Sequence, residues 1–403
     1  RAVGSWRKVR SDDEDDRSEV NVNTPARHIL ISAMAACVAI SASRTSAVAS
    51  GNDRAAPSHA TLTNESYRPF LINNLFNYYG NNGDGSHNKF SLSNEGFEFP
   101  KGSDKHIIFE DGLLWGGFHK GRDTAKAGGS VYWHALQPGP LLTNGTPTTG
   151  PVAADPSDPR YHIYSVRPDI GPDTPFPTVE AMLNAEEVPY ISRYEPLSAR
   201  GIYDRYIADW NAWPAAEGAP FTDVDKNGMY DPALDIPGQP GADQTLWYGA
   251  NDMNDSLTQR LAGCPPIGLE VQRTIWGYRR NGALGNTIFI STVLINKSGA
   301  PVDSMYITQW SDPDLGYAGD DHVGCDTTLD LGYVYNGSAF DATYGVAVPA
   351  AGFTFIQGPM TPGAPTDTAL FLSSRRPGFR NLRMSSFVAF VDGFHQFNDP
   401  ARG

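Results

Sequence analysis

A short acidic stretch, residues 221–235 (FTDVDKNGMYDPALD), has the residue types and spacing of a cation site. Its carboxylates repel one another unless a positive charge lies among them. Calcium takes roughly six to eight hard oxygens, and calcium loops alternate carboxylate side chains with a backbone carbonyl around a tight turn. We therefore predict a Ca²⁺ site with these ligand residues: Asp223, Asp225, Asn227, Met229 (through its carbonyl), Asp231 and Asp235.

The spacing of this stretch follows the EF-hand loop only in part. Counted from Asp223, acidic or amide side chains occupy positions 1, 3, 5 and 9, and Gly228 occupies position 6. Position 12, where an EF-hand has its bidentate glutamate, is Leu234, and Asp235 follows one residue later. Prolines on both sides exclude flanking helices, so we predict a calcium loop without them. An Asx-rich turn with a solvated acidic rim is the alternative.

A second acidic cluster, SDPDLGYAGDDHVGCD (residues 311–326), directly follows a β-prone run. These acids are therefore expected at a sheet edge or on the loop that leaves it. We predict a second metal site or a structural loop, with a solvated loop and a catalytic acid pair as alternatives. Hydrolysis of a glycosidic bond needs two carboxyl groups about 5–10 Å apart, one with a pKa raised by burial. The candidates are Asp312, Asp314, Asp320, Asp321 and Asp326.

Motifs of known catalytic chemistry are absent from the sequence. It contains no H-E-x-x-H, no G-x-S-x-G, no P-loop and no convincing dinucleotide glycine pattern. Two weaker polar stretches, NNGDGSHN (residues 81–88) and NDMND (residues 251–255), are explained by turn chemistry. We therefore assign no catalytic residue and no organic cofactor, and we favour a role without catalysis.

The composition favours a β-rich fold with many turns. Of the 403 residues, 40% are hydrophobic and only 19% are charged, with 41 Gly and 31 Pro, which is unlike a helical bundle. The formal net charge of −14 argues against a nucleic-acid partner, because such proteins carry a basic surface. An acidic surface suits solubility and divalent cations instead.

The N-terminal region predicts export. Residues 27–49 combine Arg27 and His28, an apolar run from Ile29 to Ala42, and a small-residue cleavage pattern ending at Ala49. The run is shorter than the ~18–20 residues that cross a bilayer, so we predict a signal peptide and no membrane span in the mature chain. A lipoprotein box ending at Cys37 is the less favoured alternative, because apolar residues continue beyond it.

The segments on either side of the predicted signal peptide are polar. Residues 1–26 contain SDDEDD and no methionine, so we predict a non-native read-through extension upstream of a start near Val20 or Val22. Residues 50–66 are interpreted as a polar leader. Export would leave Cys264 and Cys325 in the mature chain, where they either pair or remain buried thiols.

The remaining chain is expected in two regions. Residues 67–260 are predicted as a loop-rich β region that carries short helices and the calcium loop, with a hairpin turn at Glu110-Asp111-Gly112. Helices are predicted in residues 177–188 and 198–213. The second helix has an apolar stripe, which we assign to the core: Ile202, Tyr206, Trp210 and Trp213.

Residues 261–403 are predicted as an antiparallel β-sandwich that is truncated at its C-terminal end. The sequence shows successive β-prone runs separated by turn residues, without helical patterns between them, which is typical of an antiparallel meander. These runs are residues 269–280, 286–296, 303–312 and 328–336. The fold class that we predict is therefore mainly β, an antiparallel β-sandwich with long loops and a few short helices.

Several motifs together resemble a family of large exported proteins without an established activity. They include NNLFNYYGNNGDGS, QTLWYGANDMND, GLEVQRTIWGY and MSSFVAF, and the similarity runs from about Asn73 to the C-terminus. Members of that family are cargo of the type IX secretion system and usually end in a small β-sandwich sorting domain. The resemblance implies export, and it implies that this chain is a fragment without its sorting domain. It implies no reaction.

These observations lead to one expected function and two alternatives. We expect a secreted or cell-surface calcium-binding β-protein with an adhesive, structural or glycan-contacting role. Its expected partners are extracellular glycans or other cell-surface components. The first alternative is a secreted hydrolase that acts on polysaccharide through paired carboxylates of the second cluster. The second is a purely structural stalk segment.

Overall fold

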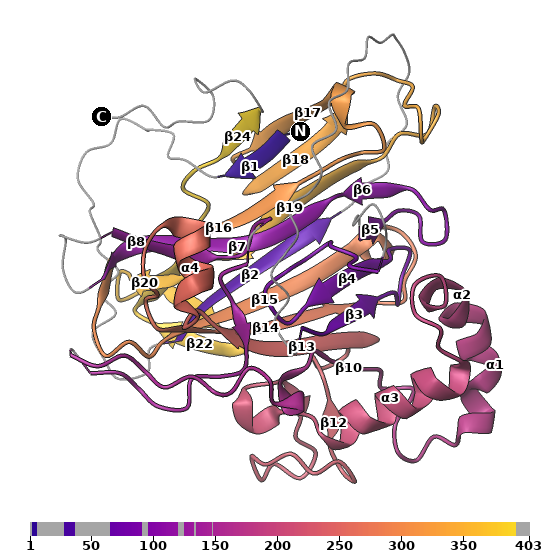
Figure 1. Ribbon diagram of the computed structural model, residues 1–403, viewed down its shortest axis with the longest axis horizontal. Helices are drawn as coiled ribbons and strands as arrows, with labels where there is room; N and C mark the ends of the chain where they lie inside the picture. Colours follow the sequence, from indigo (N-terminus) through magenta and orange to yellow (C-terminus); the bar gives the residue numbers. More distant parts are fainter. Residues whose placement is uncertain are drawn as a thin grey trace.

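The fold is mainly β, and the predicted antiparallel sandwich is confirmed (Figure 1). The computed structural model describes residues 2–5, 28–36, 65–90, 96–119, 125–132, 134–146 and 148–391. Within these residues, two large antiparallel sheets share one apolar core, and a group of short helices lies beside one end of the larger sheet.

The smaller of the two large sheets has five strands. Its order is β24 (Val388–Val391), β1 (Ala2–Ser5), β16 (Val302–Asp312), β7 (Glu110–His119) and β8 (Ala125–Gly129). The hairpin turn predicted at Glu110-Asp111-Gly112 is wrong, because these residues are the first three of β7. The reason is the partner strand: β16 places Asp312 opposite Glu110 and Trp310 opposite Gly112, which extends the ladder through the acidic residues.

The larger sheet has nine strands, eight of them in one continuous order with β9 (Gln137–Pro138) pairing beside β13. The order is β10 (Tyr164–Val166), β13 (Gln244–Asn251), β14 (Leu269–Gly277), β15 (Thr287–Asn296), β2 (His28–Ala36), β19 (Ala350–Gln357), β18 (Leu331–Asn336) and β17 (Asp321–Asp326). The predicted meander is confirmed for β14 and β15 and is wrong for β16, which crosses to the smaller sheet.

The core of the sandwich joins both sheets. Leu113 and Trp115 of β7 belong to the same buried cluster as Leu246, Ile275 and Ile290 of β13, β14 and β15. Burial alternates along the second half of β14, as expected for a strand with one face against the core. Both sheets take strands from either side of residue 260, so the two predicted regions contribute to one pair of sheets.

The predicted helices form a layer next to β10 (Figure 1). They are α1 (Phe176–Glu186) and α3 (Ala199–Asn211), and α2 (Val188–Ile191), which the sequence did not predict, lies between them in the chain. Apolar side chains of these helices form a second buried cluster with β3 and β4. The Ser198 hydroxyl caps α3 by accepting a hydrogen bond from the Gly201 N–H. Ile202, Tyr206 and Trp210 are buried, as the stripe predicts.

Shorter elements connect these layers. A fourth helix, α4 (Asp255–Ala262), packs against β8. Four single-turn 3₁₀ helices cover Pro159–Tyr161, Ala215–Glu217, Ala283–Asn286 and Ala318–Asp320. Two-stranded pairs are formed by β3 (Tyr67–Phe70) with β4 (Asn77–Gly80), β5 (Phe97–Glu98) with β6 (His106–Ile108), β11 (Phe221–Thr222) with β12 (Ile236–Pro237), β20 (Met360–Pro362) with β23 (Phe379–Asn381), and β21 (Thr368–Phe371) with β22 (Ser374–Pro377).

The predicted N-terminal segments are described only in part. Strand β1 lies within the predicted extension 1–26, and β2 lies within the predicted signal peptide 27–49. Strand β2 pairs with β15 on one side and β19 on the other, so cleavage after Ala49 would remove a strand from inside the larger sheet. The rest of residues 1–64, including most of the predicted polar leader 50–66, lies outside the described residues. Export remains a prediction.

Two further properties bear on the expected environment of the chain. Cys264 and Cys325 are both free thiols, so the structure does not pair them. Of the helices in the described part of the chain, none has the length and apolar character needed to span a bilayer.

Candidate metal centre

The predicted calcium loop is closed at its base by a two-stranded clamp. Strands β11 and β12 pair antiparallel, with Phe221 opposite Pro237 and Thr222 opposite Ile236. The loop of residues 223–235 therefore begins and ends at the same place, which brings its first and last carboxylates together.

Aromatic contacts fix the loop to α3. The Tyr230 hydroxyl donates a hydrogen bond to the Trp210 carbonyl at 2.7 Å, and the Trp210 indole N–H donates to the Pro232 carbonyl at 3.0 Å. Tyr230 also packs edge-on against Phe221 of the clamp, with ring centroids 5.5 Å apart. The loop is thus held by α3 on one side and by the clamp at its base.

Three carboxylates meet in this loop. Asp223, Asp225 and Asp235 each offer an oxygen, and these oxygens lie within 4.8 Å of one another. Asp235 is only 2% exposed, and its two oxygens accept hydrogen bonds from the Val224 and Asp231 N–H groups at 2.9 and 2.8 Å. Asp235, which lies one residue after position 12 of the EF-hand spacing, is therefore the third carboxylate of the group.

The turn inside the loop depends on a glycine. Lys226 and Gly228 have φ values of +61° and +79°, and such left-handed backbone favours glycine. This conformation turns the Gly228 N–H toward Asp223, whose Oδ2 accepts it at 2.8 Å, while Oδ1 accepts from the Asn227 N–H at 3.2 Å. These backbone hydrogen bonds, that from Gly228 first, lower the pKa of Asp223, so its carboxylate is ionised and ready for a cation.

The other predicted ligands differ in their placement. The Asn227 side chain donates to Asp225 Oδ2 at 2.7 Å, so it lies beside the three carboxylates. Asp231 does not join their group, because its Oδ1 accepts from the Ala233 N–H at 2.9 Å and helps to form the turn before Asp235. The Met229 side chain is exposed, and the predicted ligand atom of this residue is its backbone carbonyl oxygen. Three carboxylates with neighbouring carbonyl and amide oxygens are the ligand chemistry of calcium.

The second predicted cluster does not converge. Asp321 begins β17 and Asp326 ends it, and a six-residue strand separates such ends by about 16 Å. Asp326 caps an exposed turn by accepting from the Thr328 N–H and hydroxyl, so the structure does not bring it together with Asp321. Asp312 is the buried last residue of β16 and accepts from the Tyr132 hydroxyl at 2.5 Å.

Asp314, Asp320 and Asp321 stay near one another at the start of β17. Asp321 Oδ2 accepts from the Leu315 N–H at 2.8 Å, whereas its buried Oδ1 has no hydrogen-bond partner among the described residues. Burial, followed by the charges of Asp314, Asp320 and Asp341, raises the pKa of Asp321 to about 7. Asp320 has a raised pKa for the same main reason, burial.

We expect the replacement Asp321→Asn to stabilise the protein at neutral pH. Because the folded-state pKa of Asp321 is raised, its contribution is favourable at about pH 4 and is lost as the pH rises through 7. The asparagine amide stays neutral at every pH. As the pH rises from about 4 to 7, the free energy of unfolding of the variant should therefore increase by about 1–2 kcal/mol relative to that of the wild type. Denaturant unfolding at a series of pH values measures this. Asp326→Asn, at the other end of β17, is the control and should show no such gain.

Sequence reasoning missed another group of ligand-type side chains. Asp84, Glu110 and His134 are all buried, with ligand atoms within 4.8 Å of one another. Burial raises the pKa of Asp84 to about 6 and that of Glu110 well above its ordinary value. Asp84 was interpreted as part of a turn and Glu110 as part of a hairpin. No spacing rule links the three residues, because only the fold brings their segments together.

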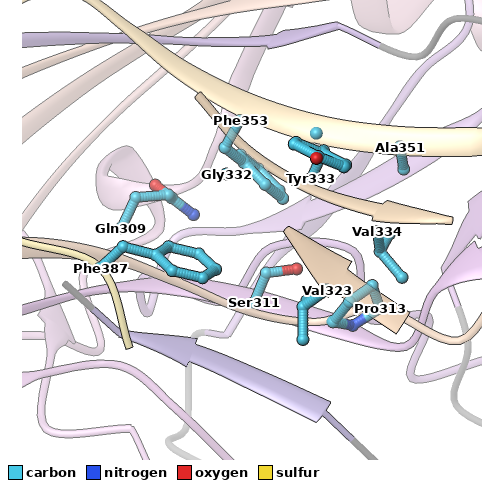
Figure 2. Close-up of a pocket in the computed structure, with 11 residues that line it drawn as sticks. Gln309, Ser311, Pro313, Val323, Gly332, Tyr333, Val334, Ala351, Phe353 and Phe387 are labelled. Atoms are coloured by element: carbon cyan, nitrogen blue, oxygen red, sulfur yellow. The ribbon is translucent and has the colours of Figure 1, made fainter. Parts of the chain in front are cut away.

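Three pockets of the described residues differ in size and lining. A pocket of about 40 Å³ between the sheets, large enough for about one water molecule, is lined by Gln309, Phe353 and Phe387 among others (Figure 2). Two wider hollows, of about 700 and 590 Å³, have no aromatic side chain among the described residues that line them. Neither includes a carboxylate of the second cluster.

Comparisons with protein-family models, with curated proteins and with solved structures gave no match for this chain. Its class therefore follows from fold and site alone. It is a mainly β protein of two packed antiparallel sheets that carries an acidic loop with three converging carboxylates beside its helices. The similarity to type IX secretion cargo remains an expectation.

Proposed function

We propose that this is an exported, extracellular or cell-surface protein that binds Ca²⁺ in the loop of residues 223–235 and has an adhesive, structural or glycan-contacting role. One observation carries the calcium proposal: the oxygens of Asp223, Asp225 and Asp235 lie within 4.8 Å of one another at the closed base of a clamped loop. A cation at their centre neutralises charges that otherwise repel.

Calcium in this loop would stabilise the folded conformation of the loop. The ion binds the folded loop and not the unfolded chain, so it stabilises the protein by mass action. Extracellular calcium modules commonly have dissociation constants of about 10⁻⁴–10⁻³ M, a range that suits the extracellular setting. The proposal therefore links the site to the predicted export.

The surface of the same loop supports a contact role. Val224, Met229 and Leu234 are 51%, 70% and 49% exposed, and Ile236 at its base is also exposed. Large apolar side chains on one loop are typical of surfaces that contact a partner. Calcium would fix the loop that displays them, so contact with a cell-surface component would depend on the ion.

We expect calcium removal to lower the melting temperature of the full chain by about 2–3 °C. An ion at roughly ten to a hundred times its dissociation constant stabilises the folded state by about 1.4–2.7 kcal/mol, and the large unfolding entropy of a chain of this length converts that free energy into a small shift. Thermal unfolding with CaCl₂ or with EGTA measures this. In the double variant Asp223→Ala/Asp225→Ala, the difference between the two conditions should vanish.

Asp326→Ala is the matched control, because it removes an exposed acidic turn cap from a different part of the surface. Its melting temperature should respond to EGTA as the wild type does. A wild-type melting curve that EGTA leaves unchanged would remove the calcium proposal. Binding to a glycan array without release of products would support the contact role over the polysaccharide hydrolase.

A further inference from the structure

We propose that Asp84, Glu110 and His134 form a second, interior metal site that binds one divalent transition-metal ion of the Zn²⁺ or Mn²⁺ type. The site is independent of the calcium loop in both position and ligand chemistry. Asp84 lies on the loop after β4, Glu110 opens β7, and His134 follows β8.

Their ligand atoms already converge. One atom from each of the three side chains lies within 4.8 Å of the other two, and all three residues are buried. His134 Nε2 is 3.7 Å from Asp84 Oδ2, which is too long for a good hydrogen bond and leaves room for an ion between them. Zinc binds to imidazole nitrogen and carboxylate oxygen at about 2.0–2.2 Å, so ligands of one ion lie about 3–4 Å apart.

Two buried carboxyl oxygens of this group receive no hydrogen bond from an N–H group or a hydroxyl of the described residues. They are Asp84 Oδ1 and Glu110 Oε1, which belong to neighbouring carboxyl groups. Asp84 and Glu110 are 0% and 1% exposed, so bulk water does not compensate them either. An unsatisfied buried carboxylate is costly, and a metal ion is a ligand that removes the cost.

Neighbouring charges do not supply the missing cation. The nearby Asp111 has its own partners: Arg273 Nη2 lies 3.8 Å from Asp111 Oδ1, and the Ser86 hydroxyl donates to Asp111 Oδ2 at 2.6 Å. Arg273 therefore balances Asp111. Among the described ion pairs, no lysine or arginine pairs with Asp84 or Glu110, and His134 lies beside Asp84.

The histidine is oriented as a metal ligand. His134 Nδ1 and the Ser130 hydroxyl are 2.9 Å apart, in a short turn whose ends also pair through their backbones. This contact at Nδ1 orients the ring with Nε2 toward Asp84, and a partner on the second ring nitrogen is the usual arrangement around a metal-bound histidine. The Tyr67 hydroxyl donates to Asp84 Oδ2 at 2.8 Å and orients that carboxylate in the same way.

Two glycines allow the three segments that carry Asp84, Glu110 and His134 to approach one another closely. A side chain at Gly85 would meet Asp111 Oδ1 at 2.4 Å, and one at Gly112 would meet the Ser130 carbonyl at 2.2 Å. Both contacts are too close for any residue but glycine. The first joins the Asp84 loop to β7, and the second joins β7 to the turn that carries His134.

The ligand set distinguishes this site from the loop. Calcium prefers roughly six to eight oxygens, whereas one imidazole with two carboxylates in a closed interior suits Zn²⁺ or Mn²⁺. Because all three side chains are buried, the ion is expected to enter during folding. Two ions of different type can therefore occupy one chain.

The test uses the full chain refolded from denaturant with EDTA, dialysed, and then refolded with ZnCl₂ in excess CaCl₂, which saturates the loop. After gel filtration, elemental analysis should find about one zinc per chain. A competing chelating dye then gives the zinc dissociation constant. We expect Glu110→Gln, which keeps the shape and removes the charge, to raise that constant by about 100-fold or more.

Control variants separate this site from other histidine and aspartate groups. His162→Gln removes a histidine that lies 2.8 Å from Asp209, outside the site, and should keep one zinc. Asp223→Ala/Asp225→Ala should also keep it. Retention of no zinc by the wild type, equal retention by Glu110→Gln, or loss in the calcium-loop variant would each overturn the proposal. If Glu110→Gln does not fold, the visible spectrum of the Co²⁺-loaded wild type decides, because a spectrum identical to aqueous Co²⁺ contradicts a protein-bound site.

Discussion

Arg167→Met is expected to lower the free energy of unfolding by about 3–5 kcal/mol, because it leaves a buried carboxylate without its cation. Arg167 and Glu187 are each 1% exposed at the side chain and form a buried ion pair. The Tyr206 hydroxyl donates to the same carboxylate at 3.1 Å, so the pair joins β10, the α1–α2 junction and α3. Denaturant unfolding of the variant measures the loss.

The Glu187 carboxyl group also determines how the stability loss of Arg167→Met depends on pH. Burial already raises the pKa of Glu187, and loss of the guanidinium raises it further. A raised folded-state pKa gives stability that is present at low pH and lost as the pH rises, so the deficit of Arg167→Met should narrow on acidification.

Two controls separate the buried charge from simple loss of an ion pair. The double variant Arg167→Met/Glu187→Leu removes both charges and should recover most of the lost stability. Arg200→Met breaks an exposed pair with Asp204 on α3 and should leave unfolding almost unchanged. If Arg167→Met were as stable as the wild type, the proposed role of the buried Arg167–Glu187 ion pair in the helical layer would be contradicted.

Gly112→Ala is expected to lower the free energy of unfolding by about 2–3 kcal/mol, because the added methyl group overpacks a site with no room for it. That methyl group would lie 2.2 Å from the Ser130 carbonyl oxygen. Ser130 cannot relieve this clash by a side-chain rotation, because the clashing atom belongs to its backbone. The turn that carries His134 must then move away from β7. Denaturant unfolding measures the cost.

Gly116→Ala is the matched control for this variant. Gly116 lies in the same strand, and a methyl group there meets its nearest atom, the Lys126 carbonyl oxygen, at an ordinary 3.5 Å. It should therefore change stability by less than about 0.5 kcal/mol. Equal effects at the two glycines would show that strand preference, and not the close approach to Ser130, determines the loss.

The sequence predicted those features that depend on neighbouring residues. The stripe of Ile202, Tyr206 and Trp210 has a helical period, and its burial in α3 is confirmed. Trp213 is buried too, but it lies beyond the helix and packs against Tyr164 of β10. The fold class was predictable for the same reason, since alternation and turn residues are local signals.

Features set by distant pairing were not predictable. Glu110-Asp111-Gly112 has the composition of a turn, and only the partner strand β16 makes it part of β7. The crossing of β16 to the smaller sheet likewise depends on β7, which comes nearly two hundred residues earlier in the sequence.

The two proposed metal sites show the same contrast. The predicted calcium loop lies within 15 consecutive residues, so its spacing alone was enough to group Asp223, Asp225 and Asp235. The interior group draws one residue from each of three segments, and two glycines of close approach set its geometry. Asp326 lies apart from Asp321 although the two residues are close in sequence, because the extended strand β17 separates its two ends.

Calcium titration by calorimetry tests the central claim most directly. Chelator-stripped full chain is expected to bind one Ca²⁺ in the loop, with a dissociation constant in the range of extracellular modules, about 10⁻⁴–10⁻³ M or tighter. Asp223→Ala/Asp225→Ala should give no binding heat at that site, while Asp326→Ala should match the wild type. An isotherm for the double variant that is identical to the wild type would contradict the proposal that these carboxylates hold the ion.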